Sequence, residues 1–357
     1  MIVKISDDKE IYKKAAEILN NNGIIAIPTD TIYGFAVDGT RYEPIKRLKD
    51  LKKREEKPFT YFIPRRLLQD YVVITKKKII DCFVPGPITV ILKKNPDGKL
   101  GSDEEKIGVR IPDYDFVINF LDYYNKPIAV TSANISGAPA LLNPFEIAEK
   151  FSEIELIIDA GTLSGKPSTV IDLTTPIPVV KRKGAIPILE IEKIYGRRIK
   201  LDPSLKFNLL FVCSGNSCRS PMAQGIIKTM LDTRYVEVKS AGTAAMDGLP
   251  ASENARAIVK EFGGDISDHR TRYLTEELID EADLILVMEF KHYETVLEIS
   301  PGSAIKTFLL KEYKRRTKYN EVSDPVGRDL STYRDTALEM FPSLRFVAED
   351  IKRRLIQ

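Results

Sequence analysis

The sequence predicts an α/β protein of two domains, each a sheet with helices packed against it. Two observations carry this prediction: short apolar runs alternate with helical patterns along the chain, and 357 residues exceed the length of one ordinary domain. The hydrophobic fraction of 43% allows each half to bury a core of its own. We expect a first domain at residues 1–198, a linker at 199–206 and a second domain at 207–357.

Periodicity locates the elements of the first half. Apolar residues recur at helical spacing from Ile11 to Leu19, and Gly23 follows as a stop signal. The apolar run 24–28 predicts a strand, and a second strand is expected at 88–92, after the break at 85–87. Asn143 and Pro144 predict the N-cap and first residue of another helix.

The second half has the order of a parallel sheet. The continuous apolar run 207–212 predicts a buried strand, followed by a turn and a helix that begins near Pro221. A helical stripe over 255–262 ends at two glycines, and 284–288 predicts another buried strand. This strand–helix alternation predicts a doubly wound parallel sheet. The expected linker is basic and lacks periodicity.

Composition narrows the classes of function. The net charge is +3, with the positive excess in the first half, which suits nucleotide phosphates but is small for a nucleic-acid-binding protein. Three cysteines, an odd number, argue against a disulfide scaffold. No apolar run approaches the roughly 18 residues of a membrane span, and the first ten residues do not resemble a signal peptide. We expect a cytoplasmic protein with reduced thiols, no membrane partner and no metal site.

A phosphate-binding loop is predicted between the strand 207–212 and the helix near Pro221. Backbone N–H groups and a helix dipole converge at such a loop and suit a phosphate dianion. They also lower the pKa of a thiol at the centre, and Arg219 adds positive charge. Cys213 is therefore the candidate nucleophile, and Arg219 the phosphate ligand. Asp324, which precedes a proline, is the candidate general acid, although an Asp-Pro pair alone is more often a turn.

Four segments of the second half carry a family resemblance: CSGNSCRSPMA at 213–223, SAGT at 240–243, ISDHRTR at 266–272 and SDP at 323–325. In this order they resemble the low-molecular-weight protein tyrosine phosphatase family. The resemblance implies the three catalytic roles above and a phosphoprotein substrate. It also implies supporting residues around the loop, namely Ser214, Gly215, Asn216, Ser217, Cys218, Ser220 and His269. Cys218 resembles a second loop cysteine that can form a reversible disulfide with the nucleophile, or it is a packing residue.

Other chemistries of this loop remain as alternatives. Arsenate reductases share the fold but need resolving cysteines beyond the loop, and the remaining cysteine, Cys82, lies in the other half. Ser217 stands where tyrosine-directed relatives carry a bulky aliphatic residue and arginine phosphatases carry threonine. The segment 326–328 also lacks the tyrosines of a tyrosine-directed pocket. Phosphoarginine is therefore the favoured substrate, and phosphotyrosine the alternative.

The first half contains short polar segments between its apolar runs: 28–34, 52–54, 108–112, 131–137, 168–173 and 182–184. Each alone is a weak signal, because charge runs are usually solvated helix faces and small polar runs are usually plain loops. Together, over residues 5–190, they resemble the threonylcarbamoyl-AMP synthase family of the YrdC type. The resemblance implies an open twisted α/β sheet with a positive cavity. It also implies condensation of L-threonine, bicarbonate and ATP into threonylcarbamoyl-AMP and pyrophosphate, a product used by a tRNA-modifying transferase complex.

The same resemblance assigns residues to ligands. Lys52 and Arg54 match a K-x-R pair that holds the phosphates of ATP, and Ser132 and Asn134 match an S-x-N pair at the nucleotide. The remaining assignments are Ser168 and Arg182 at the nucleotide pocket, and Thr31 and Arg110 at threonine or its carbamate. ATP enters as a substrate with Mg²⁺, and no tightly bound cofactor is expected.

Two other interpretations of the first half account for fewer of its residues. A basic concave domain could simply bind RNA weakly, but this leaves the K-x-R and S-x-N pairs without a role. Carbamoyl transfer of the hydrogenase-maturation type would add zinc-finger cysteines and an acylphosphatase module, which this sequence lacks. The sequence departs from the synthase pattern at Phe35-Ala36 and at Lys183. Neither departure removes a charged contact.

Overall fold

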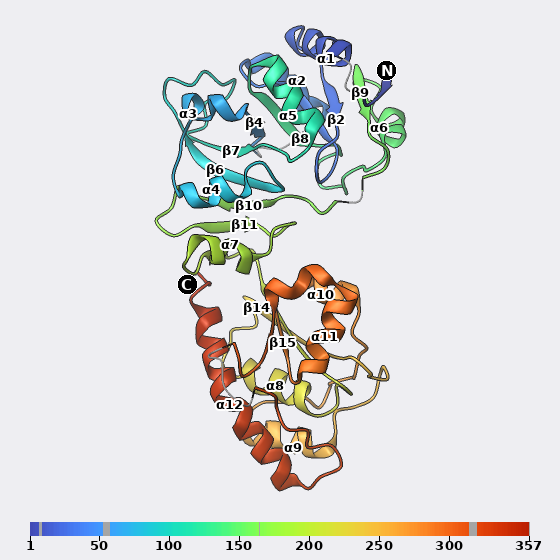
Figure 1. The fold of residues 1–357 in the computed structure, drawn as a ribbon, viewed down its shortest axis with the longest axis vertical. Helices are drawn as coiled ribbons and strands as arrows, with labels where there is room; N and C mark the ends of the chain where they lie inside the picture. The colour runs from blue at the N-terminus through green and yellow to red at the C-terminus, as the bar shows by residue number, and fades with distance from the viewer. Residues whose placement is uncertain (7–8, 53–57, 164, 314–319, 357) are drawn as a thin grey trace. The chain divides into compact units, whose positions relative to one another are not determined.

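The computed structural model describes residues 1–6, 9–52, 58–163, 165–313 and 320–356 (Figure 1). By their internal contacts the residues form two compact units. One consists of Met1–Ile186 with Ile194–Gly196, and the other of Pro187–Lys193 with Arg197–Gln357. Within the described ranges, the structure contains no helix with the length and apolar character needed to cross a membrane.

The first unit is built on a mixed sheet. Its strands are β1 (Ile2–Lys4), β2 (Ile25–Ile27), β3 (Gly34–Asp38), β4 (Thr60–Phe62), β5 (Val72–Val73), β6 (Ile88–Lys94), β7 (Lys106–Arg110), β8 (Ile128–Ser132), β9 (Leu156–Asp159), β10 (Thr169–Asp172) and β11 (Val179–Arg182). Their order is β1-β9-β2-β3-β8-β4-β7-β6-β10-β11, with β5 paired to β6. Parallel and antiparallel pairs both occur, as between β4 and β7 and between β3 and β8. The predicted open α/β sheet is confirmed.

Helices cover this sheet. They are α1 (Lys9–Asn20), α2 (Tyr42–Leu51), the short 3₁₀ turn η1 (Arg65–Leu67), α3 (Leu68–Tyr71), α4 (Lys77–Phe83), α5 (Asp115–Tyr124) and α6 (Pro144–Lys150). The apolar faces of α1 and α5 share one core with β2, β3, β8 and β9, and the rings of Tyr12 and Phe116 lie 5.3 Å apart there. Asn143 caps α6 as predicted, because its side chain accepts a hydrogen bond from the Phe145 N–H at 2.8 Å.

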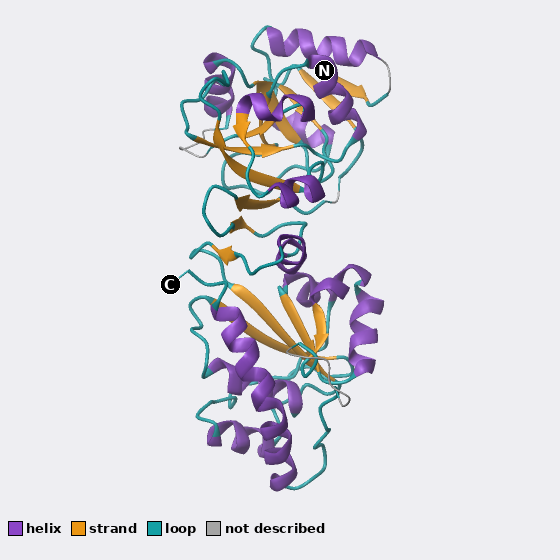
Figure 2. Cartoon of the chain, turned by 60° about the vertical axis from the view of Figure 1, so that its left-hand side comes forward, coloured by secondary structure: helices purple, strands orange, loops and turns teal. Residues whose placement is uncertain are grey.

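The second unit is a parallel sheet with helices on both faces (Figure 2). Its strands are β13 (Phe207–Cys213), β14 (Val236–Gly242), β15 (Leu284–Val287) and β16 (Thr307–Leu309), in the order β14-β13-β15-β16. Its helices are α8 (Arg219–Lys228), α9 (Glu253–Glu261), α10 (Glu276–Glu281), α11 (Phe290–Ile299), the 3₁₀ helix η2 (Pro301–Lys306) and α12 (Leu330–Lys352). The doubly wound sheet is confirmed, and α8 begins two residues before Pro221.

The sheet order defines where ligands can bind. From β13 the chain moves to β14 on one side and then crosses to β15 on the other. The carboxyl end of β13 is therefore a topological switch point, where open α/β sheets leave a crevice. Cys213 is the last residue of β13, and the predicted phosphate loop follows it directly.

Residues 188–201 contribute to the core of the second unit. They carry α7 (Ile188–Tyr195) and the short strand β12 (Lys200–Leu201). On α7, Glu192 accepts two hydrogen bonds from Arg354, at 2.9 and 2.8 Å, and both side chains are almost fully buried. Asp350 completes the cluster by accepting from Arg354 at 2.7 Å and from the Tyr313 hydroxyl at 2.6 Å. The division into units thus runs through α7, upstream of the linker expected at 199–206.

We expect Glu192→Ala to destabilise the second unit. Breaking a buried ion pair lowers the free energy of unfolding by at least about 3 kcal/mol. The lower value applies here because Asp350 still pairs with Arg354 in the variant. For a unit of this size this loss lowers the unfolding midpoint by about 6–12 °C. Thiol labelling of Cys213 during a thermal ramp measures it, because Cys213 is buried in the second unit. Glu190→Ala, on the same helix, is the matched control, and an unchanged labelling temperature in Glu192→Ala would contradict the prediction.

Candidate active sites

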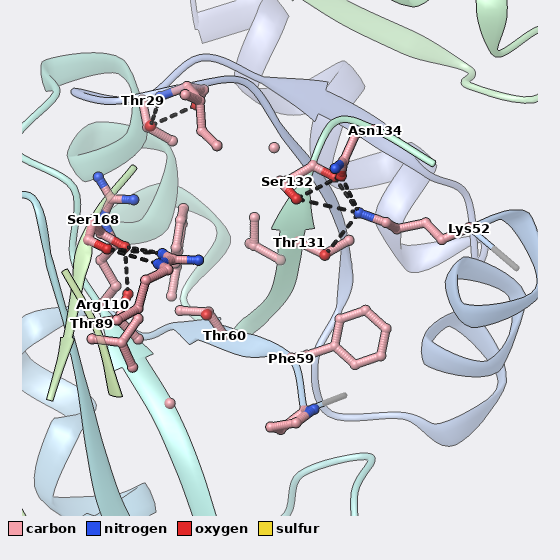
Figure 3. Close-up of a pocket in the computed structure, with 18 of the residues that line it drawn as sticks. Thr29, Lys52, Phe59, Thr60, Thr89, Arg110, Thr131, Ser132, Asn134 and Ser168 are labelled. Carbon is pink, nitrogen blue, oxygen red and sulfur yellow. Dashed lines mark hydrogen bonds between the residues drawn. The ribbon is translucent and has the colours of Figure 1, made fainter. Parts of the chain in front are cut away.

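The first unit contains a cavity of about 370 Å³ above the middle of its sheet. Polar side chains gather at two sides of it (Figure 3). One group consists of Lys52, Thr131, Ser132 and Asn134, and the other includes Thr89, Arg110 and Ser168. Arg182 also lines the cavity. The cavity therefore collects residues from segments that are far apart in the sequence.

Lys52, just after α2, anchors the first group, and its side chain is almost completely buried. Its ammonium donates to Asn134 Oδ1 at 2.8 Å and to Thr131 Oγ1 at 3.1 Å, and also to the carbonyl of Ser132. The Ser132 hydroxyl donates to Asn134 Oδ1 at 2.7 Å. The predicted lysine and S-x-N pair therefore meet, although about 80 residues separate them. Arg54 lies outside the described residues.

Ser168 is the centre of the second group. Its hydroxyl lies 2.9 Å from Thr89 Oγ1, and Arg182 donates to its hydroxyl at 3.0 Å and to its carbonyl at 2.9 Å. Gly184 makes this packing possible, because a Cβ there would lie 2.3 Å from the carbonyl oxygen of Pro167. This close approach explains why residue 184 is a glycine.

Arg110, the last residue of β7, is buried beside the second group. Its guanidinium donates to Thr31 Oγ1 at 2.9 Å and to the carboxylate of Asp30. Burial lowers the pKa of Arg110, opposed by Asp30 and reinforced by the charge of Arg182, and burial likewise lowers the pKa of Arg182. Thr31 does not itself line the cavity, but it accepts a hydrogen bond from Arg110, which does.

Sequence reasoning missed several residues of this site. Asp30 is the most important, since it holds Arg110 and also accepts from the Asp113 N–H at 3.1 Å. Its signal was its place between Thr29 and Thr31 in a polar run already selected. Thr89 and Lys106 also line the cavity, but nothing in their local sequence distinguishes them from other strand residues. With several cations, hydroxyls and amides around one cavity, the site can bind an extended anion and a second small polar molecule.

The phosphate loop of the second unit surrounds the sulfur of Cys213. The Asn216 N–H donates to this sulfur at 3.3 Å, and the Ser220 hydroxyl lies 3.0 Å from it. Asn216 has a left-handed φ of 52°, and its side-chain amide donates to Ser220 Oγ and Ser240 Oγ, both at 2.9 Å. His269 Nε2 lies 2.9 Å from the Asn216 carbonyl oxygen. The predicted supporting residues Asn216, Ser220 and His269 therefore converge on the loop.

The remaining loop residues have separate neighbours. The Ser214 hydroxyl lies 2.8 Å from His292 Nε2, and Gly215 is exposed at the tip of the loop. Ser217 is partly exposed, with its hydroxyl 3.6 Å from Cys218 Sγ. Cys218 is buried, and its thiol lies 3.1 Å from the hydroxyl of Tyr333 on α12. Both loop cysteines are free thiols.

Arg219 brings two carboxylates to the loop. Its side chain is buried and pairs with Glu289 at 2.5 Å and with Asp324 at 2.6 Å. It also donates to the carbonyl of Val322 at 3.1 Å. The predicted general acid, 105 residues away in the chain, is thereby placed beside the predicted phosphate ligand. Glu289 was not predicted, and its only signal was an acidic residue just after the strand expected at 284–288.

His292 is a second residue that the sequence analysis missed. It is fully buried on α11, accepts from the Glu289 N–H at 3.1 Å and faces Ser214. Burial lowers the pKa of His292 to about 4, so its ring is neutral near pH 7. A neutral ring that accepts at Nδ1 carries its proton on Nε2, and it therefore donates to the Ser214 hydroxyl. This fixes the first residue after Cys213.

The thiol of Cys213 differs from the sequence-based expectation. Burial raises the pKa of this thiol, and the hydrogen bonds of Ser220 and Asn216 and the charge of Arg219 act in the opposite direction. The net direction is upward, whereas the loop sequence predicted a lowered pKa. The physical reason is burial of the sulfur, which outweighs the lowering effects and which the loop sequence alone does not reveal.

Comparison with known proteins agrees with this division into two sites. Residues 17–184 match the model of the Sua5, YciO and YrdC family, described as telomere recombination, and residues 208–355 match that of low molecular weight phosphotyrosine protein phosphatase. The chain is 34% identical over 203 residues to the putative threonylcarbamoyl-AMP synthase of Methanocaldococcus jannaschii, covering 54% of this chain and 97% of that protein. It is 36% identical over 148 residues to the protein-arginine-phosphatase of Geobacillus stearothermophilus, covering 42% and 98%.

Two further comparisons are with proteins of Pyrococcus abyssi. The threonylcarbamoyl-AMP synthase of Pyrococcus abyssi is 32% identical over 216 residues, which cover 57% of this chain. The chain spans 63% of that relative's length. The crystal structure of P. abyssi Sua5 complexed with L-threonine aligns with a TM-score of 0.54 at 23% identity, covering 87% of this chain and 98% of that one. Similarity at this level of identity shows a shared fold.

Proposed function

The chain belongs to the Sua5, YciO and YrdC family in its first half and to the low-molecular-weight phosphatase family in its second, and from this we propose a bifunctional enzyme. The first unit condenses L-threonine, bicarbonate and ATP into threonylcarbamoyl-AMP and pyrophosphate. The second unit hydrolyses a phosphoprotein through a cysteinyl-phosphate intermediate. A cytoplasmic location and delivery of the adenylate to a separate tRNA-modifying transferase complex belong to the same proposal.

The observation that supports the synthase is the meeting of Lys52, Ser132 and Asn134 at one side of a cavity whose other side carries Arg110. ATP enters as its magnesium complex, with Lys52 at the phosphates and Ser132 and Asn134 at the nucleotide. Arg110 binds the carboxylate of threonine. The amine of threonine attacks bicarbonate and water leaves. An oxygen of the resulting carbamate then attacks the α-phosphorus of ATP, and pyrophosphate leaves. The protein contributes orientation and charge neutralisation.

Exchange of labelled pyrophosphate into ATP tests this activity and separates it from simple RNA binding. The exchange is expected only when threonine and bicarbonate are both present, because the adenylate that reacts with pyrophosphate contains both. Exchange that proceeds without threonine would show a different adenylating chemistry. No exchange under any condition, together with RNA binding, would support the RNA-binding alternative.

The observation that supports the phosphatase is the position of Cys213 Sγ inside the loop, with Arg219 and Asp324 beside it. The Cys213 thiol passes its proton to an oxygen of the bound phosphate dianion. The resulting thiolate attacks phosphorus, an S–P bond forms, and the bond from phosphorus to the substrate oxygen or nitrogen breaks. Asp324 gives its proton to that leaving atom. Water then attacks the phosphorus, Asp324 takes the proton of this water, and Cys213 is released with inorganic phosphate. Arg219 and the loop N–H groups hold the phosphoryl oxygens throughout.

We further propose phosphoarginine as the preferred substrate, with phosphotyrosine as the alternative. Ser217 is a partly exposed residue of the loop, and a small hydroxyl there leaves room for a planar guanidinium and a polar contact. We expect Ser217→Ile to lower kcat/KM on phosphoarginine peptides by about tenfold, as loss of one polar contact does, without lowering it on phosphotyrosine peptides. Ser217→Thr, which keeps the hydroxyl, is the control. A wild-type preference for phosphotyrosine that persists in Ser217→Ile would exclude this specificity.

A further inference from the structure

Glu339 on α12 contacts both ends of the segment that leads to Asp324. Its Oε1 pairs with Lys311 Nζ at 2.7 Å, and its Oε2 accepts from the Ser323 N–H at 3.3 Å. Lys311 also donates to the carbonyl of Glu321 at 3.1 Å. One carboxylate therefore contacts both Lys311 and Ser323, and Ser323 is the residue immediately before Asp324.

The helix that carries Glu339, α12, is held in place by the helices around it. It packs against α8 and α9, and Figure 1 shows it alongside both. The hydroxyl of its Tyr333 meets Cys218 inside the phosphate loop at 3.1 Å. A side chain on α12 is thus fixed relative to the loop that holds Cys213.

Asp324 is held directly by its ion pair with Arg219. In the proposed reaction, however, the Arg219 guanidinium binds the phosphoryl group of the substrate. One terminal nitrogen of Arg219 is engaged by Glu289 and by the Val322 carbonyl, and the other by Asp324. Because Glu289 and the Val322 carbonyl occupy one terminal nitrogen, a phosphoryl group held at two points must use the other, which binds Asp324. The phosphoryl group therefore replaces Asp324 on Arg219 at the stage when Asp324 must stay close to donate its proton.

The two residues just before Asp324, Val322 and Ser323, each make a backbone N–H contact that does not involve Arg219. The Val322 N–H donates to the Met288 carbonyl at 2.8 Å, which fixes the segment to the end of β15, and Ser323 binds Glu339. We propose that Glu339 is a positioning residue for the general acid. Through Ser323 it keeps Asp324 over the phosphate loop after Arg219 has bound the phosphoryl group of the substrate. This inference rests on the proposed phosphatase function.

The expected signature is a loss that depends on the leaving group. We expect Glu339→Ala to lower kcat/KM about tenfold on phenyl phosphate, whose leaving phenolate is about as basic as that of tyrosine and needs a proton. On 4-nitrophenyl phosphate, whose leaving group needs little protonation, the change should stay within about twofold. Asp324→Ala should show the same pattern with a larger loss on phenyl phosphate, and it is the reference for loss of the acid.

Two further variants separate positioning from general damage. Glu339→Gln keeps an oxygen for the Ser323 N–H and should recover most of the loss on phenyl phosphate. Glu349→Ala removes an exposed glutamate from the same helix and should change neither substrate. Glu339→Ala could show equal losses on both substrates while Asp324→Ala keeps its leaving-group dependence. That result would overturn the positioning role of Glu339 and leave the general-acid mechanism standing. No leaving-group dependence in Asp324→Ala would overturn the general-acid mechanism, and the role of Glu339 with it.

Discussion

Cys213→Ser is expected to abolish phosphatase activity and to leave threonylcarbamoyl-AMP synthesis at the wild-type rate. The sulfur is enclosed by the Asn216 N–H and the Ser220 hydroxyl, and a serine there is not ionised near neutral pH. Loss of a nucleophile of this kind lowers kcat by about 10⁴-fold or more. Both rates are measured on the same full-length preparation, so retained synthesis shows that the loss is confined to the phosphatase activity.

Cys82 supplies the matched control for this variant. It is an exposed free thiol on α4 of the first unit. Cys82→Ser should keep both activities. Phosphatase activity in Cys213→Ser that stays within tenfold of wild type would remove Cys213 from the role of nucleophile.

Lys52→Ala should remove most of the synthesis while the phosphatase keeps its rate. The Lys52 ammonium is held beside Asn134 and Thr131 at one side of the cavity, and a preorganised charge of this kind contributes about 10²–10³-fold in rate. Pyrophosphate release that depends on threonine and bicarbonate measures the effect. Lys49→Ala, which removes an exposed lysine of α2 from the same basic run, should be near wild type. Wild-type synthesis in Lys52→Ala would refute the assignment of Lys52 to the phosphates.

The sequence predicted those features that are local in the chain. The strand ending at Cys213 is a continuous apolar run, and the turn and helix after it follow within a few residues, so periodicity and loop chemistry suffice. The same holds for α1, whose apolar residues recur at helical spacing before Gly23. Motif order then selected the residues that meet around the cavity, such as Lys52 and Asn134.

Features that depend on distant contacts were not predicted. Glu289 and His292 follow a strand without any marker of their own, and they become informative only when the sheet places them against Arg219 and Ser214. The upward shift in the pKa of Cys213 also depends on tertiary structure, because it comes from burial of the sulfur within the second unit. The position of α7 is a third case. Its apolar face predicts that the helix is buried, but it does not show that Glu192 packs in the core of the second unit.

The most direct test of a two-enzyme chain is to supply labelled bicarbonate, threonine, ATP and a phosphoarginine peptide to the full-length protein and to quantify both products together. We expect a labelled, threonine-dependent adenylate and peptide dephosphorylation in the wild type. We also expect that Lys52→Ala loses only the adenylate and Cys213→Ser loses only the dephosphorylation. The two-enzyme assignment would be contradicted if no labelled adenylate formed in the wild type, or if either variant removed both activities while remaining folded.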